Sequence, residues 1–339
     1  MAWNEKELDE VLSRPSEALI ENMKKLKGDI MILGAGGKVG PTLSVMAKRA
    51  VEKSGVSRRV IAVSRFSDPF VVELMKNEHV ETISADLTDP DQIAKLPKVE
   101  NIIFMLGRKF GTSNSACETW EINTAVPTYI TRHFGAANYV VFSTGNVYPF
   151  SELRSGACDE SVAPNPVGEY GMSSLGRERI FEYAARHLGA KVFIYRLNYA
   201  IDLRYGVIYD IAKRIVNDEP VSLGNGAFNC IWQGYANEVA IRALLHTSSD
   251  VEIVNVTGPE TVYVRDTALK LGALLGKEVS FSGTESETAL LSNSQKCMQM
   301  FGYPQVGIAD MIRLQAEWIN NGGRQLDKPT HFEEQKGKF

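Results

Sequence analysis

The sequence predicts an α/β protein, in which a doubly wound parallel sheet is followed by a smaller mixed α+β lobe on the C-terminal side. Three observations predict it. Short apolar segments alternate with helical segments from residue 28 to about residue 200, a glycine-rich turn follows the first of them, and the alternation breaks after Leu197. Strands buried on both faces appear as near-continuous apolar runs, and right-handed crossovers then place helices on both sides of one parallel sheet.

The alternating segments give the elements in order. Strands are expected at the short apolar runs 29–33, 60–63, 80–84, 102–106, 139–142 and 191–195. Helices are expected where apolar residues recur at helical spacing, over 42–51, 69–76, 90–95, 120–134 and 173–187. Beyond them, residues 202–216, 221–223, 252–256 and 264–275 are expected to form the mixed second lobe.

The two ends of the chain differ from this pattern. Residues 1–27 are polar and helix-prone, and Leu8, Leu12, Leu19 and Met23 have the spacing of an amphipathic face, so we expect an extension packed on the main domain or on a neighbouring subunit. The polar tail is expected to be frayed. The predicted boundaries are an extension over 1–27, a first domain over 28–200, a second lobe over 201–330 from which some segments can return to the first domain, and a tail over 331–339.

Composition excludes several classes of function. A net charge of −4 gives no electrostatic reason to expect nucleic acid or an anionic membrane as a partner. No apolar run approaches the roughly 20 residues that span a bilayer, and the acidic start lacks the features of a signal peptide. The four cysteines, Cys117, Cys158, Cys230 and Cys297, show no CxxC spacing, which favours reduced structural thiols over a metal site. Reduced thiols in turn favour a cytoplasmic location.

A glycine-rich segment lies between the first expected strand and the first expected helix. It reads Gly34-Ala35-Gly36-Gly37-Lys38-Val39-Gly40. Residues without side chains allow a tight turn and a close approach of the backbone to a pyrophosphate, and the helix N-terminus offers free N–H groups and a partial positive charge. Glycines at such a position can also form only a turn, but the strand before and the helix after favour a dinucleotide site.

The second expected strand bears on which dinucleotide is bound. NAD sites usually place a carboxylate at its end to bind the ribose 2′-hydroxyl, but here the chain reads Val63-Ser64-Arg65. A guanidinium can pair with a 2′-phosphate, so NADP is favoured. If Arg65 is instead a solvated surface residue, the site accepts NAD as well.

Several further motifs point to one family. Four features of the sequence resemble segments of extended short-chain dehydrogenases, the NAD-dependent epimerase/dehydratase family. They are the glycine spacing, Phe142-Ser143-Thr144-Gly145-Asn146-Val147-Tyr148, Tyr170-Gly171-Met172-Ser173-Ser174 and Arg196-Leu197-Asn198-Tyr199. The resemblance covers roughly residues 28–320 and implies a Rossmann-type domain with a substrate-binding lobe. It also implies a homodimer, because relatives commonly pair the helices expected here at 120–134 and 173–187.

The resemblance also implies binding residues. Asp86 and Leu87 match a pair that contacts adenine, and Met105, Leu106 and Gly107 lie where relatives carry small residues along the nicotinamide ribose. The cofactor set implied is Gly34, Gly36, Gly37, Lys38, Val39, Gly40, Ser64, Arg65, Asp86, Leu87, Met105, Leu106, Gly107, Asn123, Ser143, Tyr170 and Leu197. The substrate set implied is Thr144, Gly145, Asn146 and Asn198.

The catalytic set departs from the family at one position. By resemblance Tyr170 is the general acid/base and Thr144 the hydroxyl that binds the reacting oxygen, but the family's lysine is replaced by Ser174. A cation about 5 Å from a phenol stabilises the phenolate by roughly 3 kcal/mol at an effective dielectric near 20. Ser174 can bind a ribose hydroxyl but cannot supply this charge. Arg177, on about the same helical face as Tyr170, either supplies it or is a surface arginine, and the surface position is the favoured interpretation.

Two functions remain open. The first is NAD(P)-dependent hydride transfer at a secondary alcohol or ketone of a sugar or sugar-derived compound, by epimerisation, dehydration or the ketone reduction that best tolerates loss of the lysine. The second is a catalytically weak redox sensor, for which Ser174 is the support. Arg108 and Arg204 can bind a substrate anion but are favoured as solvated or structural residues, and Trp232 and Trp318 are expected to pack.

Overall fold

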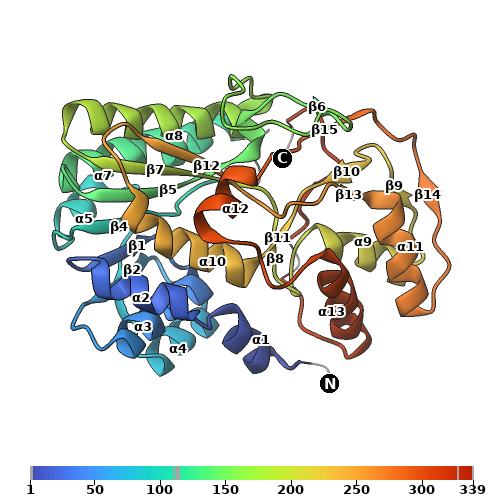
Figure 1. Ribbon diagram of the computed structural model, residues 1–339, viewed down its shortest axis with the longest axis horizontal. Helices are drawn as coiled ribbons and strands as arrows, with labels where there is room; N and C mark the ends of the chain where they lie inside the picture. Colours follow the sequence, from blue (N-terminus) through green and yellow to red (C-terminus); the bar gives the residue numbers. More distant parts are fainter. Residues whose placement is uncertain (1–2, 110, 112–114, 327, 338–339) are drawn as a thin grey trace.

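The centre of the molecule is a parallel sheet (Figure 1). The computed structural model describes residues 3–109, 111, 115–326 and 328–337, and within them seven strands form this sheet. In spatial order the strands are β12 (Glu252–Val256), β7 (Lys191–Leu197), β5 (Asn138–Thr144), β4 (Asn101–Phe104), β1 (Ile30–Leu33), β2 (Val60–Ser64) and β3 (Glu81–Ser84). The strand order reverses between β1 and β4, the switch point beside which doubly wound sheets bind ligands.

The predicted strands are confirmed within one to two residues at their ends. One assignment changed. Residues 252–256 form β12, which lies at the edge of the central sheet in parallel register with β7, so that Val254 pairs with Tyr195. This strand therefore returns from the second lobe to the first domain, because its apolar residues complete both faces of the sheet.

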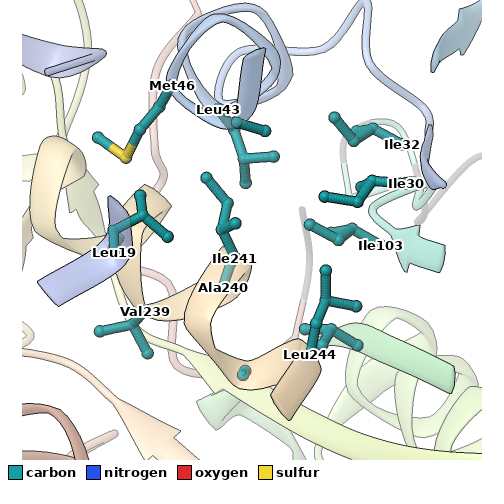
Figure 2. Close-up of a cluster of buried hydrophobic side chains, with 14 of the residues drawn as sticks. Leu19, Ile30, Ile32, Leu43, Met46, Ile103, Val239, Ala240, Ile241 and Leu244 are labelled. Atoms are coloured by element: carbon teal, nitrogen blue, oxygen red, sulfur yellow. The ribbon is translucent and has the colours of Figure 1, made fainter. Parts of the chain in front are cut away.

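Helices cover both faces of the sheet. Alternate strand residues point to opposite sides, so Ile30 and Ile32 face one core while Met31 and Leu33 face the other. The first core is covered by α2 (Glu17–Lys25), α3 (Gly40–Ser54), α4 (Pro69–Asn77), α10 (Gln233–Arg242), η3 (Ala243–His246) and α12 (Gln295–Phe301), and Figure 2 shows its centre. The second is covered by α5 (Pro90–Ala94), α7 (Val126–Phe134) and α8 (Gly168–His187).

Two helices differ from their expected bounds in ways that position the site. The helix expected at 120–134 is built of α6 (Ala116–Trp120), a π-helical turn η1 (Glu121–Ala125) and α7. The helix expected from residue 173 begins at Gly168, whose φ of +78° suits glycine. Tyr170 therefore lies in the first turn of α8.

The second lobe has its own core. It is formed by α9 (Val207–Val216), α11 (Val264–Leu275) and α13 (Ile308–Asn320), together with residues of short strands packed around them. The short elements of the chain are η2 (Gly145–Val147), β6 (Ser151–Glu152), β8 (Ala200–Ile201), β9 (Val221–Ser222), β10 (Ala227–Phe228), β11 (Ile231–Trp232), β13 (Val262–Tyr263), β14 (Phe281–Ser282) and β15 (Thr288–Ala289). Trp232 and Trp318 are buried in this core, which confirms them as packing residues.

The N-terminal extension joins the two cores. Its four apolar residues, Leu8, Leu12, Leu19 and Met23, are all fully buried, which confirms the predicted amphipathic face. Helix α1 (Glu5–Leu12) contributes to the core of the second lobe, whereas α2 contributes to the core on the sheet. The extension therefore bridges both parts of the molecule.

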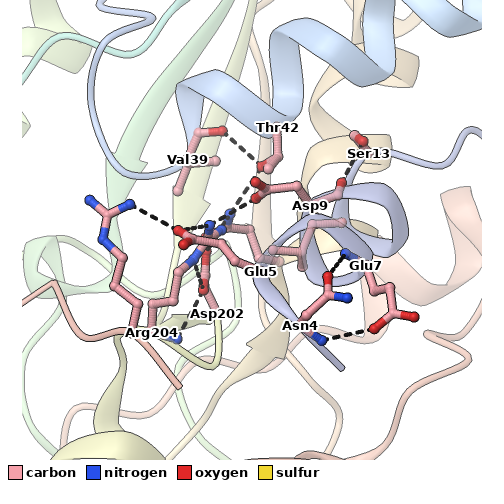
Figure 3. A network of polar contacts seen from close by, with 12 residues as sticks. Asn4, Glu5, Glu7, Asp9, Ser13, Val39, Thr42, Asp202 and Arg204 are labelled. Atoms are coloured by element: carbon pink, nitrogen blue, oxygen red, sulfur yellow. Dashed lines mark hydrogen bonds and ion pairs between the residues drawn. The ribbon is translucent and has the colours of Figure 1, made fainter. Parts of the chain in front are cut away.

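Arg204 is at the centre of the polar network that ties α1 to the second lobe (Figure 3). Its guanidinium lies 2.7 Å from Asp202, 2.8 Å from Asp9 and 3.3 Å from Glu5. The side chain is almost fully buried, so Arg204 is structural. Burial of the network raises the pKa of Asp9, although Arg204 opposes the effect.

The expectation of a frayed tail is wrong for residues 331–337. Phe332 is buried in the core of the second lobe, and Asn225 donates a 2.8 Å hydrogen bond to its carbonyl oxygen. Just before it, Thr330 donates from its backbone and its hydroxyl to Asp210. A single buried aromatic residue anchors a segment whose composition is otherwise polar, and composition alone did not reveal it.

Candidate active site

The glycine loop leads from β1 into α3 at the switch point of the sheet. Gly34 has a φ of +90°, and a Cβ on it would lie 2.8 Å from the backbone nitrogen of Leu106. A Cβ on Gly36 would lie 2.5 Å from the Ser64 hydroxyl, and one on Gly40 would lie 2.4 Å from the Ala35 carbonyl oxygen. The loop is therefore a backbone surface at the N-terminus of a 15-residue helix, where N–H groups attract anions.

Two adjoining cavities lie along this loop. Both are lined by Gly34, Gly36, Gly37, Met105 and Gly107, and their volumes are about 410 Å³ and 250 Å³. Each approaches or reaches the size range of ligand pockets in proteins. The larger is also lined by Lys38, Val39, Gly40, Phe142 and Lys109, and the smaller by Ser64, Arg65, Asp86, Leu87 and Leu106. Most of the predicted cofactor residues thus line one continuous cleft.

The smaller cavity has a polar rim. Asp86 accepts hydrogen bonds from the backbone and hydroxyl of Thr88, which together hold the pKa of its carboxyl below the usual value. Arg65 is exposed on the same rim and adds a favourable charge interaction with Asp86. A guanidinium and a carboxylate therefore both face this end of the cleft.

The turn after β5 and the first turn of α8 bring the predicted catalytic groups into one region. Thr144 ends β5, and its hydroxyl donates a 3.0 Å hydrogen bond to Asn146. Gly171 packs against the Asn146 backbone so tightly that a Cβ there would lie 2.6 Å from its carbonyl oxygen. The first turn of α8 therefore packs on the Thr144 turn, and Tyr170, which precedes Gly171, is half-buried.

Asn198 completes this corner from the end of β7. A Cβ on Gly145 would lie 1.9 Å from its amide oxygen, so only glycine fits there. The Asn198 amide nitrogen donates to the hydroxyl of Ser292 in the second lobe. The predicted substrate residues are therefore in contact with one another.

Three predicted residues have structural partners. The Ser143 hydroxyl donates a 2.6 Å hydrogen bond to Glu178. The Asn123 amide oxygen accepts a hydrogen bond from the Arg108 backbone N–H, and its amide nitrogen donates to the Arg108 carbonyl oxygen and the Ser173 hydroxyl. These bonds link the π-helical turn to α8 and to the loop after β4. Leu197 is half-buried against the core on the sheet.

Ser174 and Arg177 are both buried in α8. The Ser174 hydroxyl has no hydrogen-bond partner among the residues that the structure describes. Arg177 donates to the carbonyl oxygen of Phe142 at 2.7 Å and to Asn123 at 2.5 Å, and its guanidinium lies against Gly107 and over the ring of Phe104. The interpretation of Arg177 as a surface arginine is therefore wrong.

The charge on Arg177 is maintained. Burial lowers the pKa of Arg177 to about 10, and interactions with Tyr170 and Glu178 act in the opposite direction. The guanidinium is thus protonated at neutral pH and is electrostatically coupled to the phenol of Tyr170.

Lys109 is a site residue that the sequence interpretation missed. Its ammonium lies 5.9 Å from the ring centroid of Tyr170 and 5.5 Å from that of Tyr199, and it donates a 3.1 Å hydrogen bond to the Thr330 carbonyl oxygen. Burial lowers the pKa of Lys109 to about 8. Its place just after Gly107, at the carboxyl end of a central strand, is the signal that could have identified it.

Two searches complete the description. Among the described residues no group of three or more histidine, cysteine, aspartate or glutamate side chains could hold a metal ion, and all four cysteines are free thiols. None of the helices described is long and apolar enough to cross a membrane.

Comparison with known proteins agrees with this geometry. Among solved structures, MoeE5 in complex with UDP-glucose and NAD is 18% identical, with a TM-score of 0.66 over 87% of this chain and 99% of that chain. UDP-glucuronic acid 4-epimerase from Bacillus cereus, in complex with UDP-glucuronic acid and NAD, is 18% identical, with a TM-score of 0.70 over 86% and 99%. UDP-glucose 4-epimerase from Thermus thermophilus, in complex with NAD, is 16% identical, with a TM-score of 0.69 over 86% and 99%.

Sequence comparison identifies the family. No curated protein matches the chain. The model of the NAD dependent epimerase/dehydratase family matches residues 30–226, which is more than half of the sequence. The chain therefore belongs to the NAD dependent epimerase/dehydratase family.

Proposed function

We propose that the protein transfers hydride between a nicotinamide dinucleotide and a secondary alcohol or ketone of a sugar or sugar-derived compound. The observation that carries this proposal is the cleft along the glycine loop, which extends to Lys109 beside the phenol of Tyr170. Epimerisation, dehydration and ketone reduction all use this transfer.

The residues present fit a dinucleotide. Side chains at Gly34, Gly36 and Gly40 would clash with Leu106, Ser64 and Ala35, so the glycines keep the turn tight, and the N-terminus of α3 attracts the charge of a diphosphate. The adenosine end fits the cavity at Asp86 and Leu87, and the nicotinamide end fits beside Met105 and Gly107. When bound, the nicotinamide supplies the hydride acceptor or donor.

The chain's own residues handle the proton and the reacting oxygen. Tyr170 accepts the hydroxyl proton during oxidation and returns one during reduction. Thr144 holds the same oxygen through its hydroxyl, whose orientation Asn146 sets. Arg177 supplies the positive charge that the family places at position 174, because it is protonated, buried and coupled to Tyr170.

A phenylalanine at position 170 tests this function. With purified protein and a panel of free and nucleotide-linked sugars, we expect Tyr170→Phe to lower turnover by about 100-fold or more while changing dinucleotide affinity less than about threefold. Tyr183→Phe, at an exposed tyrosine of the same helix, is the matched control. Turnover that survives in Tyr170→Phe would remove Tyr170 as the proton carrier.

The dinucleotide itself belongs to the proposal. The family and the solved neighbours are described with NAD, while Arg65 on the rim of the smaller cavity favours a 2′-phosphate. We infer that both forms bind and that NADP binds more tightly. Titrating wild type and Arg65→Ser with NAD and with NADP gives the ratio of the two dissociation constants for each protein. An unchanged ratio in Arg65→Ser would mean that Arg65 does not contact the 2′-phosphate.

A catalytically weak redox sensor is the second candidate. The observation that favours it is the buried Ser174 hydroxyl, which leaves the family's lysine position without a charge. Ser174→Lys separates the candidates. If the site is a crippled enzyme, the new ammonium raises turnover, whereas if Arg177 already supplies the charge, a second cation beside it lowers turnover.

We also propose a homodimer in a reducing compartment such as the cytoplasm. Trp120, Tyr129, Met172 and Tyr183 are exposed on α6, α7 and α8, the helices that relatives pair. Exposed aromatic residues of this kind are enriched at protein interfaces. Sedimentation of wild type and Tyr183→Glu measures the assembly, since a charge within a dimer interface favours monomers.

A further inference from the structure

Three segments from distant parts of the chain meet beside the larger of the two cavities along the glycine loop. They are α1, the first turn of α4 and residues 321–326 after α13, and in Figure 1 α1 accordingly lies between α4 and α13. Asp9, Phe70 and Arg324, one from each segment, line this cavity together with Gly36 and Gly37. The N-terminal extension and the second lobe therefore contribute walls to the cleft in which the dinucleotide binds under the proposed function.

Arg324 connects the three segments. Its guanidinium lies 4.8 Å from the ring centroid of Phe70, and it donates a 2.9 Å hydrogen bond to the carboxylate of Glu5 in the first turn of α1. The indole N–H of the buried Trp318 donates to the Arg324 carbonyl oxygen at 3.1 Å, so the second lobe sets the backbone position of Arg324. We call the contacts of Arg324 with Phe70 and Glu5 the cleft clasp, because they join the first domain to the other two parts beside the cavity.

The cleft clasp is the exposed side of the network around Arg204. The Arg204 side chain is 8% exposed and pairs with Asp202 and Asp9. By contrast, the Arg324 side chain is 40% exposed and Phe70 is 39% exposed. Exposed ion pairs and exposed cation–π contacts are weak, whereas a buried guanidinium that loses its carboxylates is strongly destabilising. The clasp can therefore open while the buried part of the network keeps α1 on the second lobe.

We propose that the cleft clasp is a gate for the dinucleotide, which has to open before the dinucleotide enters or leaves. This inference rests on the proposed function, because it takes the larger cavity as part of the dinucleotide site. Opening separates Arg324 from Phe70 and leaves the glycine loop unchanged, since no residue of that loop takes part in the clasp. The residence time of the dinucleotide is thus set by contacts that the N-terminal extension and the second lobe supply.

Stopped-flow binding of NADH and NADPH, followed by their fluorescence, tests the gate on the full chain. Arg324→Met removes the charge that contacts both Phe70 and Glu5, so the dissociation rate of the dinucleotide should rise by about tenfold. Because the dinucleotide passes the same contacts on entry, the association rate should rise by a similar factor, and the Kd should change by less than about threefold. Arg313→Met, at an exposed arginine of α13 with its own carboxylate partners, should leave both rates unchanged.

Two milder variants separate a gate from a general loss of structure. Phe70→Leu and Glu5→Gln each break one contact of the clasp, so each should raise both rates by less than Arg324→Met does. Unchanged rates in Arg324→Met would overturn the proposal. A Kd that rises as much as the dissociation rate, with an unchanged association rate, would overturn it too, because Arg324 would then be an ordinary binding contact.

Turnover decides the proposed function separately. If the dinucleotide binds and no sugar is turned over, the proposed function fails while the two rates still decide the gate. If sugars are turned over and the rates in Arg324→Met equal those of wild type, the gate fails alone. If neither NADH nor NADPH binds to the wild type, both proposals fail.

Discussion

Ser174 and Arg177 lie one helical turn apart, and both are buried in α8. A helix that packs on both sides presents buried positions beyond a single apolar stripe, so a charged residue there need not face water. Arg177 has two strong acceptors, the Phe142 carbonyl oxygen and Asn123, which offset the cost of burying its guanidinium. Under the proposed function, Arg177 supplies the charge that the family's lysine would place near Tyr170.

This relocation predicts an asymmetry between the two directions of hydride transfer. Arg177→Met should lower turnover for alcohol oxidation by about tenfold or more at neutral pH, because oxidation needs the phenolate. Reduction should fall less, because a neutral phenol can donate the proton. Arg177→Lys should recover part of the oxidation rate, and Arg179→Met, at an exposed position of the same helix, should change neither. Equal losses in both directions would mean that Arg177 only supports the fold.

Lys38 lines the larger cavity, so dinucleotide binding should depend on pH. Burial, Lys109 and Lys328 lower the pKa of Lys38 to about 7, while Asp210 acts in the opposite direction. A diphosphate favours the protonated amine, so affinity should fall as pH rises above 7, by up to about tenfold per pH unit. NAD titrations at pH 6, 7 and 8.5 measure this fall. Lys38→Met should flatten the profile, whereas Lys24→Met, at an exposed residue, should retain it.

The lowered pKa of Lys38 also makes the free energy of unfolding depend on pH. The pKa of Lys38 is lower in the folded protein than in the unfolded chain, so between pH 7 and about 10.5 the unfolded chain binds more protons. The contribution of Lys38 therefore makes the free protein more stable as pH rises through this window. Bound dinucleotide should remove this effect, because a diphosphate beside Lys38 would keep the amine protonated.

At the scale of elements, α8 is fastened to the sheet by a buried ion pair. Arg196 on β7 makes two hydrogen bonds of 2.7 Å and 2.9 Å to Glu178, which also accepts from Ser143. Glu178→Gln removes one charge and leaves the guanidinium buried, so the free energy of unfolding should fall by about 3–5 kcal/mol. Chemical denaturation measures it. Glu182→Gln, at a more exposed pair with Arg179, should cost less than about 1 kcal/mol, and equal effects would contradict this view of α8.

The elements were predictable to the extent that each carries its own periodicity. The strands and most helices followed from apolar spacing, and the glycine loop from its place between β1 and α3. The start of α8 did not, because Gly168 and the polar residues after it give no cap signal and the helix is set by packing against η2. The position of β12 in the sheet was also not predictable from local sequence, because it depends on pairing with β7, which is distant along the chain.

At the scale of the whole molecule, the candidate site combines residues whose separation in sequence hid their proximity. The glycine loop and the β5 turn were predictable because each carries a complete motif. Lys109 and residues 330–337 were not, because their contacts join the first domain to the second lobe. The residues missed are thus those that depend on how the two parts meet.

The N-terminal extension contributes to that arrangement and predicts how the protein unfolds. Leu12 is fully buried in the core of the second lobe, its carbonyl oxygen accepts from Asn237 on α10, and Asp9 of the same helix pairs with Arg204. Because α2 packs in the other core, Leu12→Ala should lower the free energy of unfolding by about 2–5 kcal/mol in one cooperative transition. Lys25→Ala, at an exposed residue of α2, should change it by less than about 0.5 kcal/mol. If the extension were a separate appendage, Leu12→Ala would release residues 1–27 to proteolysis and leave the main unfolding transition unchanged, an outcome that denaturant titration with limited proteolysis would reveal.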